Sequence, residues 1–249
     1  MTATRTRKRF LAALVLACLP VAGAACDLDP REKLAEATTE RPRPSPTRPA
    51  RTADLTSRDT AEFREDLRTA QSVVDAYWRA NWGRHFTGRY RPPRVVGLYD
   101  GNDRSSRPRC GDQPLAKNNA VYCPAADYVA WDVSLMRTGY ARGDAWVYMV
   151  IAHEWGHAIQ SRLRRDLVSA AGELQADCLA GAVLYGAAAD GTLRFEDGDE
   201  QEIVNAFQVI GDRTPWTKPG DHGNATQRLR AFSRGGTGGV GACLIRTEG

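Results

Sequence analysis

The sequence predicts an α+β domain that is mostly helical and has a small β-sheet before a buried helix. Apolar side chains recur at helical spacing on both sides of residues 94–133. Residues 94–133 instead contain short β-type runs separated by Gly, Asn, Asp and Pro. The 249 residues are 42% hydrophobic and 26% charged, with a mean hydropathy of -0.46. This balance is typical of a globular protein with a sizeable core, not of a disordered or membrane-embedded chain.

The N-terminal segment has the order of an export signal. Basic residues come first, an apolar run from Phe10 to Leu19 follows, and small residues lead to Cys26. We therefore expect residues 1–26 to be a signal peptide or a lipoprotein signal, with Cys26 as the candidate lipidation site. An uncleaved anchor is the weaker alternative, because the apolar stretch 10–25 contains a proline and is shorter than the roughly 20 residues that span a bilayer. The predicted location is outside a bacterial cytoplasm, extracellular or in the cell envelope, with membrane contact only through this segment.

Residues 27–58 predict a disordered tether. This stretch is rich in Pro, Arg, Glu and Thr and offers little apolar surface to offset the entropy of ordering. Its alternating prolines set stiffness and reach, and nothing in it encodes a partner.

The net charge gives no reason to expect nucleic-acid binding. The chain carries a formal charge of +4, but four basic residues precede the first acidic one. They are Arg5, Arg7, Lys8 and Arg9. Without this end the chain is neutral and has no electrostatic attraction for a polyanion.

One globular domain is expected over residues 59–249. Asp59 is placed to cap its first helix while Glu62 reaches back in a capping box. Apolar side chains then recur at helical spacing as far as Tyr77. Short strands are predicted at 95–99, 120–122 and 128–133.

The second half of the domain predicts a cluster of helices. Asp144 is a candidate N-cap for a helix over 146–163, which is apolar almost all round at its start and should therefore be buried. The next helix is predicted over 167–189, where Asp190 and the glycine after it end it. Two more helices are predicted at 200–210 and 224–232.

The predicted buried helix contains the pattern H-E-x-x-H. His153 and His157 lie one turn apart on one face, with about 6 Å between their Cα atoms. Imidazole nitrogens are ligands that Zn²⁺ prefers, and a catalytic zinc site needs a third protein ligand and an open position for water. The spacing therefore predicts one zinc ion per chain, held in part by this pair.

A second pattern, E-x-x-x-D, follows on the next predicted helix. Glu173 stands sixteen residues beyond His157, where that helix would return antiparallel to the first. We expect Glu173 to be the third ligand. Asp177 lies one turn further on the same face and is placed to accept the free ring N–H of a liganding histidine, which we assign by analogy to His153.

Glu154 is the predicted general base. It lies about 100° around the helix from His153, so it faces the metal-bound water rather than the metal. Zinc lowers the pKa of bound water from about 15.7 toward roughly 7. Glu154 would accept a proton as that water attacks a peptide carbonyl and then deliver it to the leaving amine.

The same residues admit a purely structural interpretation, in which they are hydrogen-bonded core groups. One buried helix turn would then hold two histidines and a glutamate with no metal to offset their desolvation. An unpaired buried charge costs several kcal/mol. The zinc hypothesis is therefore preferred.

These motifs resemble a known family, the bacterial neutral zinc metallopeptidases of the gluzincin type. The similar segments run from Val95 to Cys243 and include Tyr122-Cys123-Pro124, Val150 to His157, Gln160, Glu173 to Gly181, Ile210-Gly211-Asp212, His222-Gly223 and Gln227-Arg228. The resemblance implies a zincin-like fold, peptidase activity on a peptide or protein substrate, ligands His153, His157 and Glu173, and Glu154 as the catalytic residue. Other gluzincins use a His or Tyr to steady the oxyanion, a role that His222 could take here. His222 could equally be part of the entry to the last helix.

Four cysteines lie beyond the signal, which suits disulfides in an exported protein. We expect Cys110 to pair with Cys123, closing a short loop, and Cys178 to pair with Cys243, pinning the C-terminal segment to the helix that carries Glu173. Zinc ligation by these cysteines is the rival interpretation, and the absence of C-x-x-C spacing disfavours it.

The sequence thus predicts an exported zinc metallopeptidase. The alternatives are a zinc-binding scaffold or binding protein of the envelope that hydrolyses nothing, and an envelope lipoprotein without zinc. No motif predicts the substrate, the cleavage preference or the oligomeric state.

Overall fold

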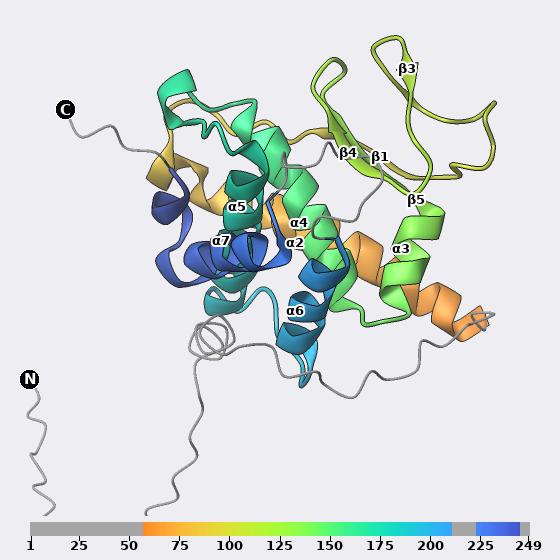
Figure 1. Ribbon diagram of the computed structural model, residues 1–249. Coiled ribbons are helices and arrows are strands. Elements are labelled where there is room, and N and C mark those ends of the chain that lie inside the picture. Colours follow the sequence, from red (N-terminus) through yellow and green to blue (C-terminus); the bar gives the residue numbers. More distant parts are fainter. Residues whose placement is uncertain (1–56, 211–222, 245–249) are drawn as a thin grey trace, which may run out of the picture.

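A computed structural model describes residues 57–210 and 223–244 of the chain (Figure 1). The fold is α+β and mostly helical with a small sheet, as the sequence predicts. Its helices are α2 Ser57–His85, α3 Val133–Tyr140, α4 Ala145–Gln160, α5 Gly172–Ala189, α6 Asp199–Ile210 and α7 Ala225–Gly238, with 3-10 turns at Arg165–Leu167 and Val240–Cys243. Its strands are β1 Arg94–Tyr99, β2 Arg109–Cys110, β3 Gln113–Pro114, β4 Ala120–Cys123 and β5 Tyr128–Asp132.

The main sheet has the order β1-β5-β4, with β1 parallel and β4 antiparallel to the central strand. All five residues of β5 are buried, which fits a continuous run of apolar and aromatic side chains between two neighbours. Strands β2 and β3 form a separate two-stranded ribbon. The sheet lies at one end of the molecule (Figure 1), and β4, its edge strand, contacts α4.

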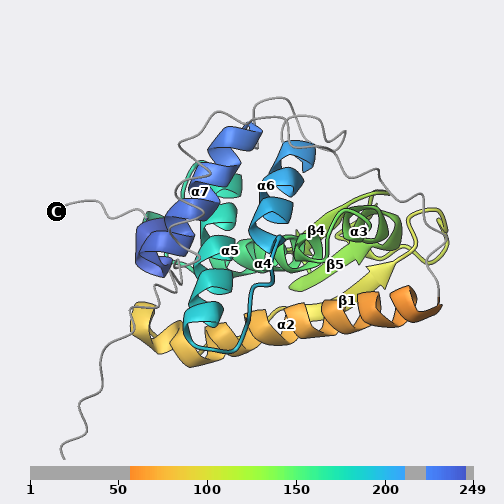
Figure 2. The same ribbon diagram turned by 90° about the horizontal axis from the view of Figure 1, so that it is seen from below.

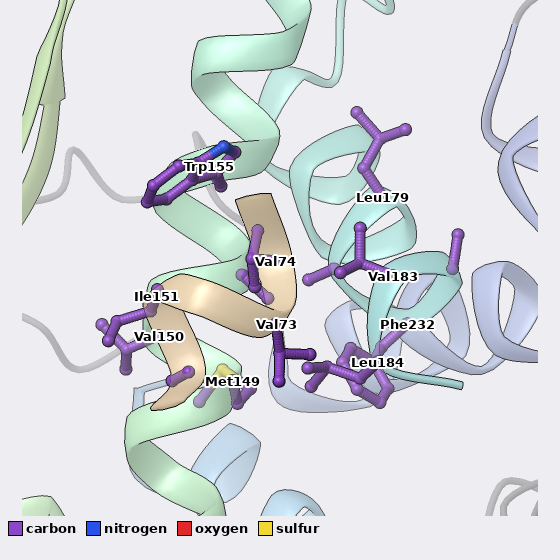
Figure 3. Packing of buried hydrophobic residues seen from close by; sticks show 14 of the residues in the cluster. Val73, Val74, Met149, Val150, Ile151, Trp155, Leu179, Val183, Leu184 and Phe232 are labelled. Carbon is purple, nitrogen blue, oxygen red and sulfur yellow. The ribbon is translucent and has the colours of Figure 1, made fainter. Parts of the chain in front are cut away.

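Helix α4 is the centre of the fold. All but three of its sixteen residues are buried, which confirms the prediction made from its apolar circumference. Helix α2 runs the length of the domain, along its lower edge in Figure 2, and places Val73 and Val74 between α4 and α5 (Figure 3). Helix α4 packs on α2, α5, α6 and the sheet, so little of it is exposed to water. This close packing fixes the position of α4 and therefore of its polar side chains.

Some boundaries differ from those predicted. Helix α2 begins at Ser57, so Asp59 lies inside the helix and does not precede it. Helix α5 begins at Gly172 and not near residue 167, because residues 165–167 form a 3-10 turn. Asp144 does precede α4, but its side chain makes no capping hydrogen bond. The tether predicted over residues 27–58 extends two residues too far, because Ser57 and Arg58 belong to α2. The other predictions for residues 1–56, including the signal and Cys26, lie outside the described residues.

Both expected disulfides are present, Cys110–Cys123 and Cys178–Cys243. The second joins α5 to the 3-10 turn that follows α7. Among the described residues, no helix is long and apolar enough to span a membrane.

Candidate metal centre

Two helices bring three ligand-type side chains to one point. His153 and His157 project from α4 with their Nε2 atoms 3.1 Å apart. Glu173, in the first turn of α5, places one carboxylate oxygen 3.2 Å from His153 Nε2 and the other 3.3 Å from His157 Nε2. The set is largely enclosed, since His153 is buried and the other two residues are half-buried.

The spacing of these atoms fits a zinc ion. A tetrahedral zinc site with bonds of about 2.0 to 2.1 Å has ligand atoms about 3.3 Å apart, and the three observed separations lie between 3.1 and 3.3 Å. Two imidazoles and one carboxylate also form a donor set that zinc prefers. The residues present could therefore hold zinc.

A glycine lets the two helices approach closely enough to form this set. Gly156 lies between the histidines, and a Cβ atom there would lie 2.8 Å from the carbonyl oxygen of Ala176 on α5. Any larger residue would push the helices apart. The glycine inside H-E-x-x-H thus has a packing role in placing Glu173 against the histidines.

Asp177 and Arg228 form a hydrogen-bonded chain that ends at Nδ1 of His153. Asp177 Oδ1 lies 2.8 Å from His153 Nδ1, so the carboxylate contacts His153, the histidine assigned to it from the sequence. Arg228, in the first turn of α7, donates to both oxygens of Asp177 at 2.8 Å. All three side chains are buried. Because an acceptor occupies Nδ1 of His153, its Nε2 atom is left to face the other ligands.

The charges in this cluster shift the pKa values of its members. Burial lowers the pKa of His153, but the charge and hydrogen bond of Asp177 outweigh it and raise the pKa to about 10. Burial alone would raise the pKa of Asp177, but the charges and hydrogen bonds of Arg228 and His153 outweigh burial, so the net pKa is lowered. Burial likewise opposes ionisation of Glu173, but hydrogen bonds from the two histidines hold its pKa below the usual range. The carboxylates are therefore ionised and available to a cation.

Glu154 lines the cleft next to these ligand atoms. It is buried, and Tyr122 of strand β4 lines the same cleft. Burial raises its pKa above that of a free glutamate. A carboxylate with a raised pKa is a better proton acceptor at neutral pH.

The cleft has a volume of about 500 Å³ and lies between β4, α3, α4 and α6. Its polar lining includes His153, Glu154, His157, Glu173 and Arg228. Its apolar lining includes Leu135, Trp146, Met149, Val150 and Ile210. A substrate of mixed polarity would fit such a cavity.

Sequence reasoning gave Arg228 no role of its own. It belonged only to the matched segment Gln227-Arg228, and its place in the first turn of a helix gave no sign that it meets Asp177. His222, the candidate oxyanion residue, lies outside the described residues.

Comparison with known proteins decides the family. The family model described as "Putative neutral zinc metallopeptidase" matches residues 7–167 and 164–244, which is most of the chain. The chain belongs to this family. Two curated relatives, each named "Uncharacterized protein YpfJ", come from Escherichia coli strain K12 and strain O6:H1. Each is 34% identical over 196 residues.

The chain spans 66% of the length of these curated relatives, and the aligned part is 66% of this chain. No solved structure matches it significantly. Membership of the zinc metallopeptidase family supports zinc as the metal of this centre and a peptidase at the level of reaction class.

Proposed function

We propose that this protein is an exported zinc metallopeptidase that hydrolyses peptide bonds. The observation that carries the proposal is a set of two imidazoles and a carboxylate, spaced as in a tetrahedral zinc site, that lines one cleft together with a buried glutamate. The family assignment supports the same class of activity.

In this proposal His153, His157 and Glu173 hold the metal, and Asp177 fixes the ring of His153. When bound, zinc would acidify a water molecule and polarise the scissile carbonyl. The residues of the chain supply orientation and proton transfer. The Asp177 carboxylate holds the Nδ1 proton of His153, so that Nε2 is the atom that would bind the metal, releasing its own proton as it does so.

Glu154 carries the proton in the reaction. Its carboxylate accepts a proton from the attacking water as the new C–O bond forms, and returns it to the amine nitrogen as the C–N bond breaks. The carboxylate lines the cleft beside the histidines and Tyr122. Burial raises the pKa of Glu154 toward the working pH, which favours both steps.

Export is part of the proposal. The basic, apolar and small-residue order of residues 1–26 supports a signal, and Cys26 is the proposed lipidation site. Two disulfides are typical of an oxidising compartment. We propose residues 27–56 as a tether that separates the domain from the membrane or trails from it.

A Glu154→Gln variant tests the catalytic assignment. Glutamine keeps the size of the side chain but cannot accept the proton, so hydrolysis of a peptide library should fall at least about 100-fold. Zinc content, measured by elemental analysis, should stay at one ion per chain, because Glu154 is not a ligand in this proposal. Peptide cleavage by the variant at the wild-type rate would reject the general-base role. Stoichiometric zinc with no cleavage by the wild-type chain would favour the non-hydrolytic scaffold.

A further inference from the structure

Two glutamine side chains connect His157 to the C-terminal segment. Gln160, the last residue of α4, places its Oε1 atom 2.8 Å from His157 Nδ1. Its Nε2 atom lies 3.1 Å from Oε1 of Gln175 on α5. Gln175 Nε2 in turn lies 3.0 Å from the backbone carbonyl of Cys243, whose side chain is joined to Cys178.

The orientation of the Gln175 amide is fixed by its partners. This side chain is buried, and its Nε2 atom donates to the carbonyls of Leu167, at 2.7 Å, and Cys243. Its Oε1 atom accepts from the backbone N–H of Ser169 at 2.9 Å. Exchanging the two ends would place an oxygen against two carbonyls and an NH₂ group against an N–H. Only one orientation satisfies all these partners, and in it Oε1 faces Gln160.

The orientation of Gln160 follows from that of Gln175. Gln160 Nε2 lies 2.6 Å from the carbonyl oxygen of Gly172 as well as 3.1 Å from Gln175 Oε1. Both atoms only accept hydrogen bonds, so the NH₂ end of Gln160 must face them. The oxygen end must therefore face His157.

The proton of His157 is placed by the same reasoning. An amide oxygen cannot donate, so a hydrogen bond of 2.8 Å between Gln160 Oε1 and His157 Nδ1 requires the proton to be on Nδ1. The lone pair of the neutral ring is then on Nε2, the atom that faces His153 and Glu173.

We propose that Gln160 and Gln175 act as a positioning pair that selects the Nδ1–H tautomer of His157 and presents its Nε2 atom to the metal. The identity of that metal as zinc rests on the proposed function, whereas the tautomer does not. The neutral amide of Gln160 gives His157 the same kind of acceptor that the carboxylate of Asp177 gives His153. Neither glutamine touches the reacting atoms, so both are positioning residues and not catalytic ones.

The metal affinity of a Gln160→Met variant tests this pair. Methionine has a similar length, but its thioether accepts only weakly and cannot donate to Gln175. Loss of such an outer hydrogen bond typically weakens metal binding 10- to 100-fold. We therefore expect the zinc dissociation constant of the full-length chain, measured by competition with a chromogenic chelator, to rise by that factor. A rise of less than twofold in a folded variant would overturn the proposal.

Gln71→Met is the matched control. Gln71 is also a partly buried helical glutamine that donates to a backbone carbonyl, that of Leu67 at 2.7 Å, but it lies on α2 away from the centre. Its substitution should change the zinc dissociation constant less than twofold. Near-ultraviolet circular dichroism of both variants verifies that each is folded. An equal loss of affinity in the control would show a general effect of stability and would overturn the assignment to Gln160.

A second measurement tests the tautomer without zinc or activity. Nitrogen chemical shifts of ¹⁵N-labelled histidine in the metal-free full-length chain should show the proton of neutral His157 on Nδ1. The chain has only four histidines, which makes assignment practicable. In Gln160→Met the two tautomers should both be populated. A proton on Nε2 in the unmodified chain would reject the positioning pair. If the unmodified chain binds no zinc, the proposed function fails, but the tautomer still decides the present inference.

Discussion

Arg228 is the buried cation that balances the carboxylate of Asp177. It is 5% exposed, and Asp177 is fully buried. The guanidinium makes two hydrogen bonds to the carboxylate and lies 5.5 Å from the ring centroid of Phe207. This paired arrangement orients Asp177 toward His153 more firmly than a single contact would.

Replacing Arg228 by Met should destabilise the protein by about 3 kcal/mol. Removing one partner of a buried ion pair leaves the other charge buried with less compensation. Urea unfolding of the metal-free chain measures the free energy of unfolding directly. Arg230→Met, at an exposed position of the same helix, is the control and should change that free energy by less than about 0.5 kcal/mol. Equal effects of the two substitutions would show that the Asp177 pair contributes little.

At the scale of elements, the start of α6 meets the start of α4 through acidic side chains. Glu202 accepts a hydrogen bond from the backbone N–H of Ala145 at 3.3 Å, and Asp144 and Asp199 lie close to it. Burial, followed by the charges of these two aspartates, raises the pKa of Glu202 to about 7 despite the bond from Ala145. Protonation of Glu202 therefore favours the packing of α6 on α4.

The raised pKa predicts a pH dependence of stability. Between the ordinary glutamate pKa of 4.5 and the raised pKa of about 7, the folded chain binds more protons at Glu202 than the unfolded chain, so the free energy of unfolding falls as the pH rises through this window. Glu202→Gln keeps an acceptor for Ala145 and removes the titration. Because Glu202 is only half-buried, solvent screening limits the gain, which we expect to be on the order of 1 kcal/mol at pH 8 and near zero at pH 4.5.

Denaturant unfolding at both pH values measures this difference. Glu65→Gln, at an exposed position of α2, serves as the control and should show no comparable gain at pH 8. A Glu202→Gln variant whose advantage does not grow between pH 4.5 and pH 8 would contradict the role given to Glu202.

How far the sequence predicts an element depends on how local its signals are. The burial of α4 follows from its apolar circumference, whereas α3 was missed because it has eight residues and begins directly where β5 ends, with Asp132 as its cap. The sequence predicts that the last helix ends at Phe232, but α7 continues through its glycines to Gly238. Gly235 is required there, since a Cβ atom would overlap the Cys178 carbonyl oxygen of α5.

The same distinction applies to the candidate site. The histidine pair depends on spacing within one helix, so a motif suffices to find it. Arg228 and Gln175 approach the site only through the packing of α5 and α7, and residue type alone does not indicate such contacts. The metal ligands and the base remain predictions that the geometry supports, whereas the fold class, the family and both disulfides are confirmed.

At the scale of the whole molecule, the two disulfides stabilise different parts of the domain. Cys110–Cys123 joins residues 13 apart in the sheet region, whereas Cys178–Cys243 joins residues 65 apart and holds the end of the domain on α5. A disulfide stabilises the folded state by restricting the unfolded chain, and the effect is larger when the closed loop is longer. We expect a contribution of about 3 kcal/mol from the first disulfide and about 4 kcal/mol from the second.

Replacing both members of each pair by alanine should therefore lower the free energy of unfolding by these amounts, and more for the pair Cys178 and Cys243. That pair also supports the metal centre, because its removal releases the Cys243 carbonyl that accepts from Gln175. We expect weaker zinc binding in this variant and unchanged zinc binding in the variant without Cys110 and Cys123. Urea unfolding and chelator competition on both variants provide the comparison. Equal zinc affinities would mean that the C-terminal segment stabilises the fold without influencing the centre.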